Sequence, residues 1–477
     1  MPPETVLPTH AATGAILART AEIAAGFLES LDERPVRARA TRAELLAALG
    51  GPLPDQGEAA EAVVEHLARE AEPGLVGMAG PRYFGFVIGG SMPAALAADW
   101  LTSTWDQNAG IYAAGPAASV VEEVVGAWLI DLFDLPRESS FGLTTGCQMA
   151  HVTCLLAARH RVLASGGWDV EADGLAGAPP IDVVVGSESH ATIATALQYV
   201  GIGRSRAIQV ASDEQGRMRL DALEAMLPEG EPPLIVCLQA GNVNTGSFDP
   251  IRPAIELVRR RRPDAWIHVD GAFGLWARAV PGLRHLAEGV ELADSWATDG
   301  HKWLNVPYDC GFAIVQDAEA HRAALAPQSG AYIVYGDEER DEFQWVPEYS
   351  RRARGFASWA ALRSQGRDGI AALVGGHHEL AVHLAEGLRA SAGEAGIDVL
   401  NDVVLNQVLI RFRPRDGMDA DERTREVIRR VQEDGTCWLA GTTWQGMTAM
   451  RFSITNWSTT AADIDQALTA ILRAARA

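Results

Sequence analysis

Residues 299–308 read DGHKWLNVPY and contain Lys302, the only lysine in a chain of 477 residues with 40 basic side chains. Arginine can supply ion pairs and solvation, but it does not lose its proton near neutral pH to attack a carbonyl carbon. A desolvated lysine amine can do so, and it then forms a Schiff base. A lysine left on the surface by chance is the alternative, but His301 and Trp303 beside it suit a solvated face poorly. Lys302 is therefore predicted to be a nucleophilic amine.

Short apolar runs alternate with helical stretches on both sides of this segment. Most of the separations are long enough for helical crossovers, which predicts an α/β domain with a mainly parallel sheet. Such sheets bind ligands at the carboxyl ends of their strands, and in this chain those ends carry His190, Asn242, Asp270 and Lys302. The strands are expected at residues 181–185, 234–238, 266–269, 295–298 and 311–315.

Changes in pattern along the chain predict three parts. Residues 1–80 form an N-terminal helical segment, residues 81–368 a large α/β domain, and residues 369–477 a small α+β domain. The first helix carries an apolar stripe over residues 16–27 that has no evident partner within its own first hundred residues. Another subunit is expected to cover it.

Composition excludes several classes of partner. A net charge of −22 argues against binding to nucleic acid or to an anionic membrane. No apolar run approaches the ~20 residues that span a bilayer, and the first thirty residues lack the pattern of a signal peptide. Five cysteines without metal-like spacing predict a reducing compartment and no metal site. We therefore expect a cytoplasmic protein.

Asp270 lies in residues 266–274, which read WIHVDGAFG. A carboxylate at the end of a buried strand is costly unless it meets a cation or a donor. A protonated pyridine nitrogen is one such partner, and this pairing turns a cofactor ring into an electron sink. Ala272 shares the side of Asp270 on an extended chain and is small enough for a flat ring to lie against it. The alternative is that Asp270 only caps a helix or a turn. This alternative is less favoured because Lys302 lies at the end of another strand.

Two further patterns are weaker. Residues 143–149 read LTTGCQM before a helix, and such a turn offers backbone N–H groups to a phosphate, although most turns of this kind only cap helices. The glycine fingerprints of nucleotide-binding loops are absent. His190 follows the strand at 181–185, where it serves either as a structural hydrogen-bonding group or as a ring that stacks on the cofactor and meets a substrate carboxylate.

Together these residues resemble the pyridoxal-phosphate-dependent group II amino-acid decarboxylases, which include the aromatic-amino-acid and glutamate decarboxylases. The resemblance runs from about Pro81 to the C-terminus and is strongest at residues 268–274 and 294–311, where His-Lys-Trp-Leu is followed by Asp-Cys-Gly. It implies a fold-type I transferase fold, pyridoxal 5'-phosphate as cofactor, and a homodimer with its site at the subunit interface. The N-terminal helices would then wrap the partner subunit.

The resemblance also implies a role for each matching residue. Lys302 would hold the cofactor as a Schiff base and His301 would touch its phosphate. Asp270 would hold the pyridine nitrogen. Ala272 would pack beneath the ring and His190 would stack above it. The phosphate loop would contain Gly146, Cys147 and Gln148, with Asn242 where the family usually has threonine, and Phe84 and Phe86 fall at the positions of aromatic substrate contacts.

The implied reaction is decarboxylation of an L-amino acid to its amine, with an aromatic substrate favoured over an acidic or a diamino one. Decarboxylases of this family carry a tyrosine on a mobile loop that returns a proton to Cα, and Tyr332 is the expected donor, with Tyr335 as the alternative. An aminotransferase and an aldehyde-forming oxidative decarboxylase would use the same Lys302 and Asp270. An inactive relative that acts as a binding protein is the third alternative.

Overall fold

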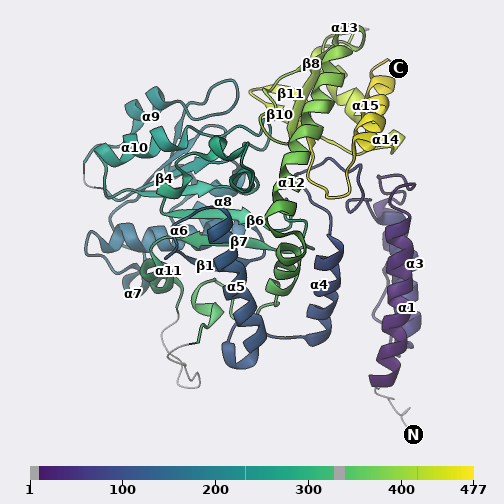
Figure 1. Ribbon diagram of the computed structural model, residues 1–477, viewed down its shortest axis with the longest axis horizontal. Coiled ribbons are helices and arrows are strands. Elements are labelled where there is room, and N and C mark those ends of the chain that lie inside the picture. The colour runs from purple at the N-terminus through teal and green to yellow at the C-terminus, as the bar shows by residue number, and fades with distance from the viewer. Residues whose placement is uncertain (1–9, 231, 327–338, 416, 477) are drawn as a thin grey trace.

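The computed structural model of the protein describes residues 10–230, 232–326, 339–415 and 417–476. It contains a large sheet, a small sheet and a separate group of N-terminal helices (Figure 1). The large sheet has seven strands in the order β1-β7-β6-β5-β4-β2-β3. Their bounds are β1 Ser140–Thr144, β2 Asp182–Gly186, β3 Ala207–Val210, β4 Leu234–Gln239, β5 Trp266–Asp270, β6 Ser295–Asp299 and β7 Gly311–Val315.

The expected mainly parallel sheet is confirmed. Strands β6, β5, β4, β2 and β3 pair in parallel, whereas β7 runs antiparallel to both β6 and β1. All five expected strands are present within one or two residues of their predicted ends. Strands β1 and β3 were not predicted, because β1 is interrupted by Gly142 and the four-residue β3 has an exposed glutamine.

Helices cover both faces of this sheet. Helices α6 (Cys147–Ala164), α8 (Ala191–Tyr199) and α11 (Ala318–Leu325) pack on one face. Helices α5 (Pro116–Leu132), α10 (Ile251–Arg261) and α12 (Gly355–Ala390) pack on the other. The strands are buried on both faces, as a sheet between two helical layers requires. Shorter helices are α7 (Val170–Asp173) and α9 (Leu220–Met226).

The C-terminal part forms a second sheet with its own core. Its four strands pair antiparallel in the order β10-β11-β9-β8, and α14 and α15 pack against them (Figure 1). This confirms the predicted α+β character of the segment. The bounds are β8 Ile397–Val399, β9 Gln407–Phe412, β10 Ala440–Trp444, β11 Met447–Ser453, α13 Ala392–Ala395, α14 Ala420–Asp434 and α15 Ala461–Arg476.

Helix α12 joins the large domain to the small one. It begins at Gly355, and it is broken at Gly366, where φ is 61° and ψ is −176°. That conformation is open almost only to glycine. The predicted domain boundary at 368/369 therefore falls inside α12, two residues after this break.

The N-terminal helices lie beside the rest of the molecule (Figure 1). They are α1 (His10–Glu29), α2 (Arg42–Leu49) and α3 (Ala60–Ala71), and neither α2 nor α3 contains a buried residue. Helix α4 (Pro93–Trp105) packs on α12. None of the described helices is both long enough and apolar enough to cross a membrane.

The aromatic segment at residues 81–87 is not a strand of either sheet and forms a single bridge between Tyr83 and Trp438. The two rings are stacked with centroids 5.0 Å apart. Phe86 and Val87 have φ angles of 55° and 56°, which bend the chain away from an extended strand.

Candidate active site

A cavity of about 380 Å³ lies at the carboxyl ends of β4, β5 and β6. Its volume is within the range of small-molecule sites, which spans roughly 300–1,000 Å³. Most of the predicted site residues meet here although they come from distant parts of the chain. The cavity is lined by Phe86, Thr145, Gly146, Cys147, Gln148, Met149, His190, Thr192, Gln239, Gly241, Val243, Asp270, Ala272, Phe273, Asp299, His301 and Lys302.

Lys302 follows β6 and reaches back to the last residue of that strand. Its Nζ lies 3.0 Å from Asp299 Oδ2. Burial lowers the pKa of Lys302, but the charge and hydrogen bond of Asp299, together with Cys147 and Asp270, outweigh this effect, so the pKa lies above its ordinary value. In the cofactor-free protein Lys302 is therefore an ammonium group. It must lose a proton before it acts as the predicted nucleophile.

Asp299 also marks where an anion binds. Its Oδ1 accepts a hydrogen bond of 2.6 Å from the backbone N–H of Cys147, the first residue of α6. A helix N-terminus carries partial positive charge and unpaired N–H donors, so it attracts carboxylates and phosphates alike. The carboxylate thus stands where the phosphate of the cofactor would bind, and the predicted loop of Gly146, Cys147 and Gln148 surrounds that position.

His301 completes this anion site. Its Nδ1 accepts the backbone N–H of Cys310 at 3.2 Å, which places the ring proton on Nε2, 3.4 Å from Asp299 Oδ1. The ring is stacked on Tyr308 with centroids 4.4 Å apart. A Cβ on Gly146 would approach His301 Cε1 to 2.9 Å, so glycine is needed for the ring to lie this close.

Asp270 is the last residue of β5 and is 5% exposed. Its Oδ1 accepts the backbone N–H of Ala272 at 3.1 Å, and both residues line the cavity. The predicted side-by-side placement of Asp270 and Ala272 is thus present. The carboxylate of Asp270 can pair with a protonated pyridine nitrogen, and the small side chain of Ala272 leaves room for the ring.

His190 caps the N-terminus of α8 and lines the same cavity. Its Nδ1 accepts the backbone N–H of Thr192 at 3.3 Å and lies 2.8 Å from Thr192 Oγ1, which fixes the ring orientation. The ring faces the cavity. Burial lowers the pKa of His190, and the positive charges of Lys302 and Arg451 lower it further, although the charge of Asp270 opposes them. A neutral imidazole is therefore available at the cavity surface.

Asn242 does not face the cavity, contrary to the expectation from its position. Its Nδ2 donates to Glu188 O at 3.1 Å and to Gln239 Oε1 at 3.0 Å, while its Oδ1 accepts the backbone N–H of Asn244 at 2.9 Å. The amide is used up in holding this turn together. Gly241 and Val243 on either side line the cavity instead.

Of the two predicted substrate contacts, only Phe86 lies at the cavity. Phe86 lines the cavity and is 57% exposed, whereas Phe84 is 1% exposed and packs in the small-domain core with ring centroids 5.7 Å from Phe452. Phe84 is therefore a core residue, and the positive φ angle of 55° at Phe86 turns the chain so that the two rings do not share a side. The expected proton donor Tyr332 and its alternative Tyr335 lie outside the described residues.

Two residues that sequence reasoning missed belong to this region. Asp299 had a visible signal, a carboxylate at the end of a buried strand three residues before Lys302. Arg451 on β11 is 7% exposed, its Nη1 donates to Asn244 at 3.4 Å, and its Nε has no hydrogen-bond partner among the described residues. Burial lowers the pKa of Arg451 to about 10. Its signal was a lone charge inside the apolar run MTAMRFS.

Residues 44–413 match the family described as the pyridoxal-dependent decarboxylase conserved domain. The chain belongs to the pyridoxal-dependent decarboxylase family. Its cofactor is pyridoxal 5'-phosphate, and the residues at the cavity fit that group through the anion site at α6, the lone lysine and the carboxylate of Asp270. The predicted family, fold type and cofactor are confirmed.

Relatives with assigned functions fall into two reaction types. The chain is 26% identical to 4-hydroxyphenylacetaldehyde synthase of Rhodiola rosea, over 87% of this chain and 85% of the relative. It is 25% identical to tyrosine decarboxylase 3 of Petroselinum crispum, over 90% of this chain and 85% of the relative. Among solved structures, that of Oryza sativa TDC with PLP and tryptamine has a TM-score of 0.90 at 23% identity and covers 99% of both chains.

Proposed function

We propose that this protein removes the carboxylate of an aromatic L-amino acid as CO2 and releases the corresponding amine. The observation that carries this proposal is the convergence of Lys302, Asp270 and His190 on one cavity that Phe86 also lines. When bound, pyridoxal phosphate supplies a ring that accepts the electron pair left behind when the bond between Cα and the carboxylate breaks. Everything else is the task of the protein's own side chains.

Each wall of the cavity has a separate task. The N-terminus of α6, with Cys147 N–H and His301 Nε2, binds the phosphate in place of Asp299. Lys302 would hold the cofactor covalently through its Nζ. Asp270 holds the pyridine nitrogen, and Ala272 leaves room for the ring.

We assign orientation of the substrate carboxylate to His190 and Arg451. His190 lines the cavity, and Arg451, which lies behind the lining residues, is close enough to lower the pKa of the His190 ring. A buried guanidinium is costly to leave without an anion. No ion pair of Arg451 occurs within the described ranges, so a substrate carboxylate is the partner that we assign to it.

An aromatic substrate is supported by the lining of the cavity and by the relatives. Phe86 and Phe273 present aromatic rings to it, and Phe86 is tilted on Trp438 with centroids 5.3 Å apart. Aromatic pairs of this kind prefer offset or tilted contacts, which a substrate ring can extend. The names of the relatives, tyrosine and tryptophan decarboxylases and two aldehyde synthases, point the same way.

The fate of Cα after CO2 leaves decides between two products. We assign its reprotonation to Tyr332, which gives the amine. The second candidate function is an oxidative decarboxylation that consumes O2 and releases aldehyde, ammonia and hydrogen peroxide. It is favoured by the similarity to 4-hydroxyphenylacetaldehyde synthase over 87% of this chain.

We also propose that the protein acts as a homodimer. Helices α1 to α3 lie beside the body of the molecule and expose large apolar side chains (Figure 1). A second copy of the chain that packs on these helices would bury them. The exposed residues include Leu17, Leu28, Leu46, Leu49, Val63 and Leu67.

The reaction is tested on the purified holoenzyme. Borohydride reduction followed by peptide mapping should place a pyridoxyl group on Lys302, a clean assignment because the chain has no second lysine. L-tyrosine, L-tryptophan, L-phenylalanine, L-glutamate and L-2,4-diaminobutyrate are then supplied in turn, and CO2, amine, aldehyde and O2 uptake are measured together.

Equal amounts of CO2 and amine from an aromatic substrate, without O2 uptake, would support the proposal. Aldehyde with matching O2 consumption would establish the second candidate. Release of a keto acid without CO2 would show an aminotransferase and contradict both. Turnover of glutamate or diaminobutyrate alone would contradict the aromatic preference.

A further inference from the structure

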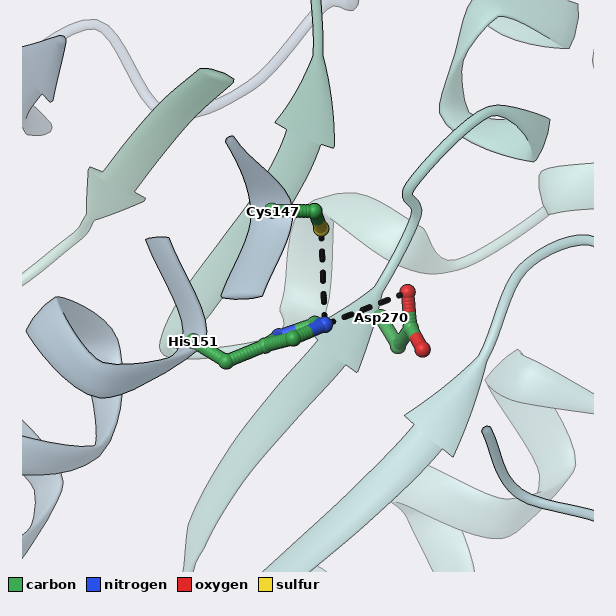
Figure 2. A group of neighbouring side chains, drawn as sticks. All are labelled: Cys147, His151 and Asp270. Carbon is green, nitrogen blue, oxygen red and sulfur yellow. Dashed lines mark hydrogen bonds and ion pairs between the residues drawn. The ribbon is translucent and has the colours of Figure 1, made fainter. Parts of the chain in front are cut away.

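A buried imidazole lies behind the carboxylate that is assigned to the cofactor nitrogen. His151, on α6, is fully buried, and its Nε2 is 3.6 Å from Asp270 Oδ1 and 3.4 Å from Cys147 Sγ. Figure 2 shows the ring edge directed between these two side chains. The distance to Asp270 is slightly too long for a hydrogen bond, as is common for active-site contacts in ligand-free proteins.

His151 is the end of a longer chain of polar groups beneath the cavity. Its Nδ1 lies 2.9 Å from His268 Nε2, and His268 Nδ1 lies 2.9 Å from Ser295 Oγ. The indole Nε1 of Trp266 donates to the same Ser295 Oγ at 2.9 Å. All four side chains are buried, so water does not compete for these contacts.

One proton order satisfies both ends of this chain. An indole N–H can only donate, so Ser295 Oγ accepts from Trp266, and its own proton can be donated to His268 Nδ1. His268 then donates from Nε2 to His151 Nδ1, which leaves the proton of His151 on Nε2, facing Asp270. The opposite order would direct the lone pair of His151 Nε2 at the Asp270 carboxylate and would need the Cys147 thiol, 3.4 Å away, as its donor.

Both imidazoles are neutral, which makes the order directional. Burial lowers the pKa of His151 to about 3, and burial together with the neighbouring His151 lowers that of His268 to about 3. A neutral imidazole carries one N–H and one lone pair, so fixing one nitrogen fixes the other.

We propose that His151 is a positioning residue that directs its Nε2 proton at Asp270 and stabilises the negative charge with which Asp270 holds the cofactor nitrogen. The role rests on the proposed function only through the task assigned to Asp270. His268 and Ser295 act through His151 by fixing its tautomer. Neither histidine touches the substrate or the cofactor.

A metal site is the other reading of this cluster, because ligand atoms of Cys147, His151 and Asp270 all lie within 4.8 Å of one another. A cysteine binds metals as its thiolate. Burial, followed by the charges of Asp299 and Asp270, raises the pKa of Cys147 well above its ordinary value, so the thiol is protonated in the metal-free protein and a metal would have to displace that proton. The hydrogen-bonded chain requires no such change and also accounts for the 2.9 Å contact between His151 and His268, so we adopt it.

The first test is the tautomer of His151 in the full-length protein. The protein is labelled with ¹⁵N-histidine, and spectra are recorded with and without bound cofactor, with His151→Gln identifying the His151 signals. A proton on Nε2 and a free lone pair on Nδ1 are expected in both states. The reverse tautomer would overturn the proposal. This result does not depend on which reaction the enzyme performs, so it is read separately from the proposed function.

The second test is the state of the cofactor nitrogen. Wild type, His151→Leu and His151→Gln are loaded with pyridoxal phosphate that carries ¹⁵N in its ring. In His151→Leu the ring ¹⁵N signal should move toward that of an unprotonated pyridine, and kcat should fall about 10- to 100-fold, the loss expected for one hydrogen bond to a charged group. His151→Gln keeps an N–H near the same place and should restore part of both changes.

His321→Leu is the matched control. His321 is equally buried and bonded to Ser140 and Trp345, but it lies on α11, outside the cavity lining. It should cost stability without moving the ring signal or kcat. An unchanged ring ¹⁵N signal in a folded, cofactor-loaded His151→Leu protein would overturn the proposal, whatever its activity. Failure of the wild type to bind the cofactor would instead contradict the function.

Discussion

At the level of single residues, Asp299 determines the starting state of the site. The side chain that predicts the chemistry, Lys302, is held as an ammonium by a carboxylate at the N-terminus of α6. The incoming phosphate and Asp299 compete for the same N–H donor. Cofactor attachment is therefore coupled to the release of an internal ion pair.

This coupling predicts how attachment responds to pH. The amine must be neutral to react, and its pKa is raised because Asp299, with Cys147 and Asp270, outweighs the effect of burial. In the wild type the attachment rate should keep rising with pH up to that raised pKa. Asp299→Asn removes the first of these raising effects while burial remains, so the plateau should move to lower pH. Stopped-flow absorbance on cofactor-free protein measures the profile, and coinciding profiles would show that Asp299 does not control the proton.

Lys302→Arg separates charge from nucleophilicity. The guanidinium preserves a cation beside Asp299 but cannot form a covalent bond with the cofactor. The variant should fold, bind pyridoxal phosphate reversibly, give no adduct with borohydride and lose at least about 10²-fold in turnover. Dialysis, mass spectrometry and CO2 release provide the three readouts. Retained turnover would show that covalent attachment is dispensable.

At the level of elements, two helices contain features that the packing depends on. Helix α5 carries Glu122, which is fully buried and accepts two hydrogen bonds of 2.8 Å from Arg351 Nη1. Arg351 also donates to the carbonyls of Ala109 and Leu143. This one guanidinium ties together three segments that lie far apart in the sequence.

Removing one partner of that pair should be costlier than removing both. Glu122→Gln leaves a buried guanidinium without its counter-charge and should lower the free energy of unfolding by about 3–5 kcal/mol. The double variant Glu122→Gln/Arg351→Met removes the unpaired charge and should recover part of the loss. Urea unfolding followed by tryptophan fluorescence compares the three proteins. A double variant as unstable as the sum of its single changes would contradict the coupling.

Helix α12 offers a paired test of its break. Gly366→Ala places a Cβ at φ 61° and ψ −176°, a conformation that costs about 1–3 kcal/mol for a residue other than glycine. Gly376→Ala, in the same helix with open space around its Cβ position, should be neutral or stabilising by about 0.5–1 kcal/mol. Thermal unfolding of both variants measures the difference. Equal melting temperatures of the two variants would show that a side chain at residue 366 is tolerated without strain, which would contradict the prediction.

At the level of the whole molecule, the mainly parallel sheet and the position of the cavity followed from the sequence, but several side chains did not. Apolar strands with polar ends located the carboxyl edge and correctly placed Lys302, Asp270 and His190 together. Pattern alone could not show that the Asn242 amide is consumed within its own turn, or that Phe84 points into a core. Both depend on the local backbone path. Near Phe84 that path is redirected by the positive φ angles at Phe86 and Val87.

Relations between distant segments were also invisible in the sequence. His151 and His268 belong to a helix and a strand that sequence patterns predicted separately. Only packing brings His151 Nδ1 within 2.9 Å of His268 Nε2. Arg451 is nearly 150 residues from Lys302 along the chain. Arg451 lies near His190 only because of the way the small domain packs on the large one. Three-dimensional contact determines such roles.

The proposed dimer is tested with one apolar position on the N-terminal helices. Leu67, on α3, is 57% exposed, and Leu67→Glu should convert dimer to monomer because it places a charge in a desolvated interface. Met226→Glu, on α9 at the far side of the molecule (Figure 1), should leave the mass unchanged. Light scattering after size exclusion measures both. A wild type that runs as a monomer would contradict the proposal.

The single lysine, largely buried beside Asp299, has a consequence for the outer surface of the protein. Reducing sugars, acyl donors and free aldehydes damage proteins by condensing with side-chain amines, and guanidinium groups are far poorer targets. Every other basic side chain of this chain is an arginine. An enzyme of this composition confines its reactive nitrogen to the place where the cofactor occupies it, and its exterior offers no lysine to glycation, acetylation or a released aldehyde.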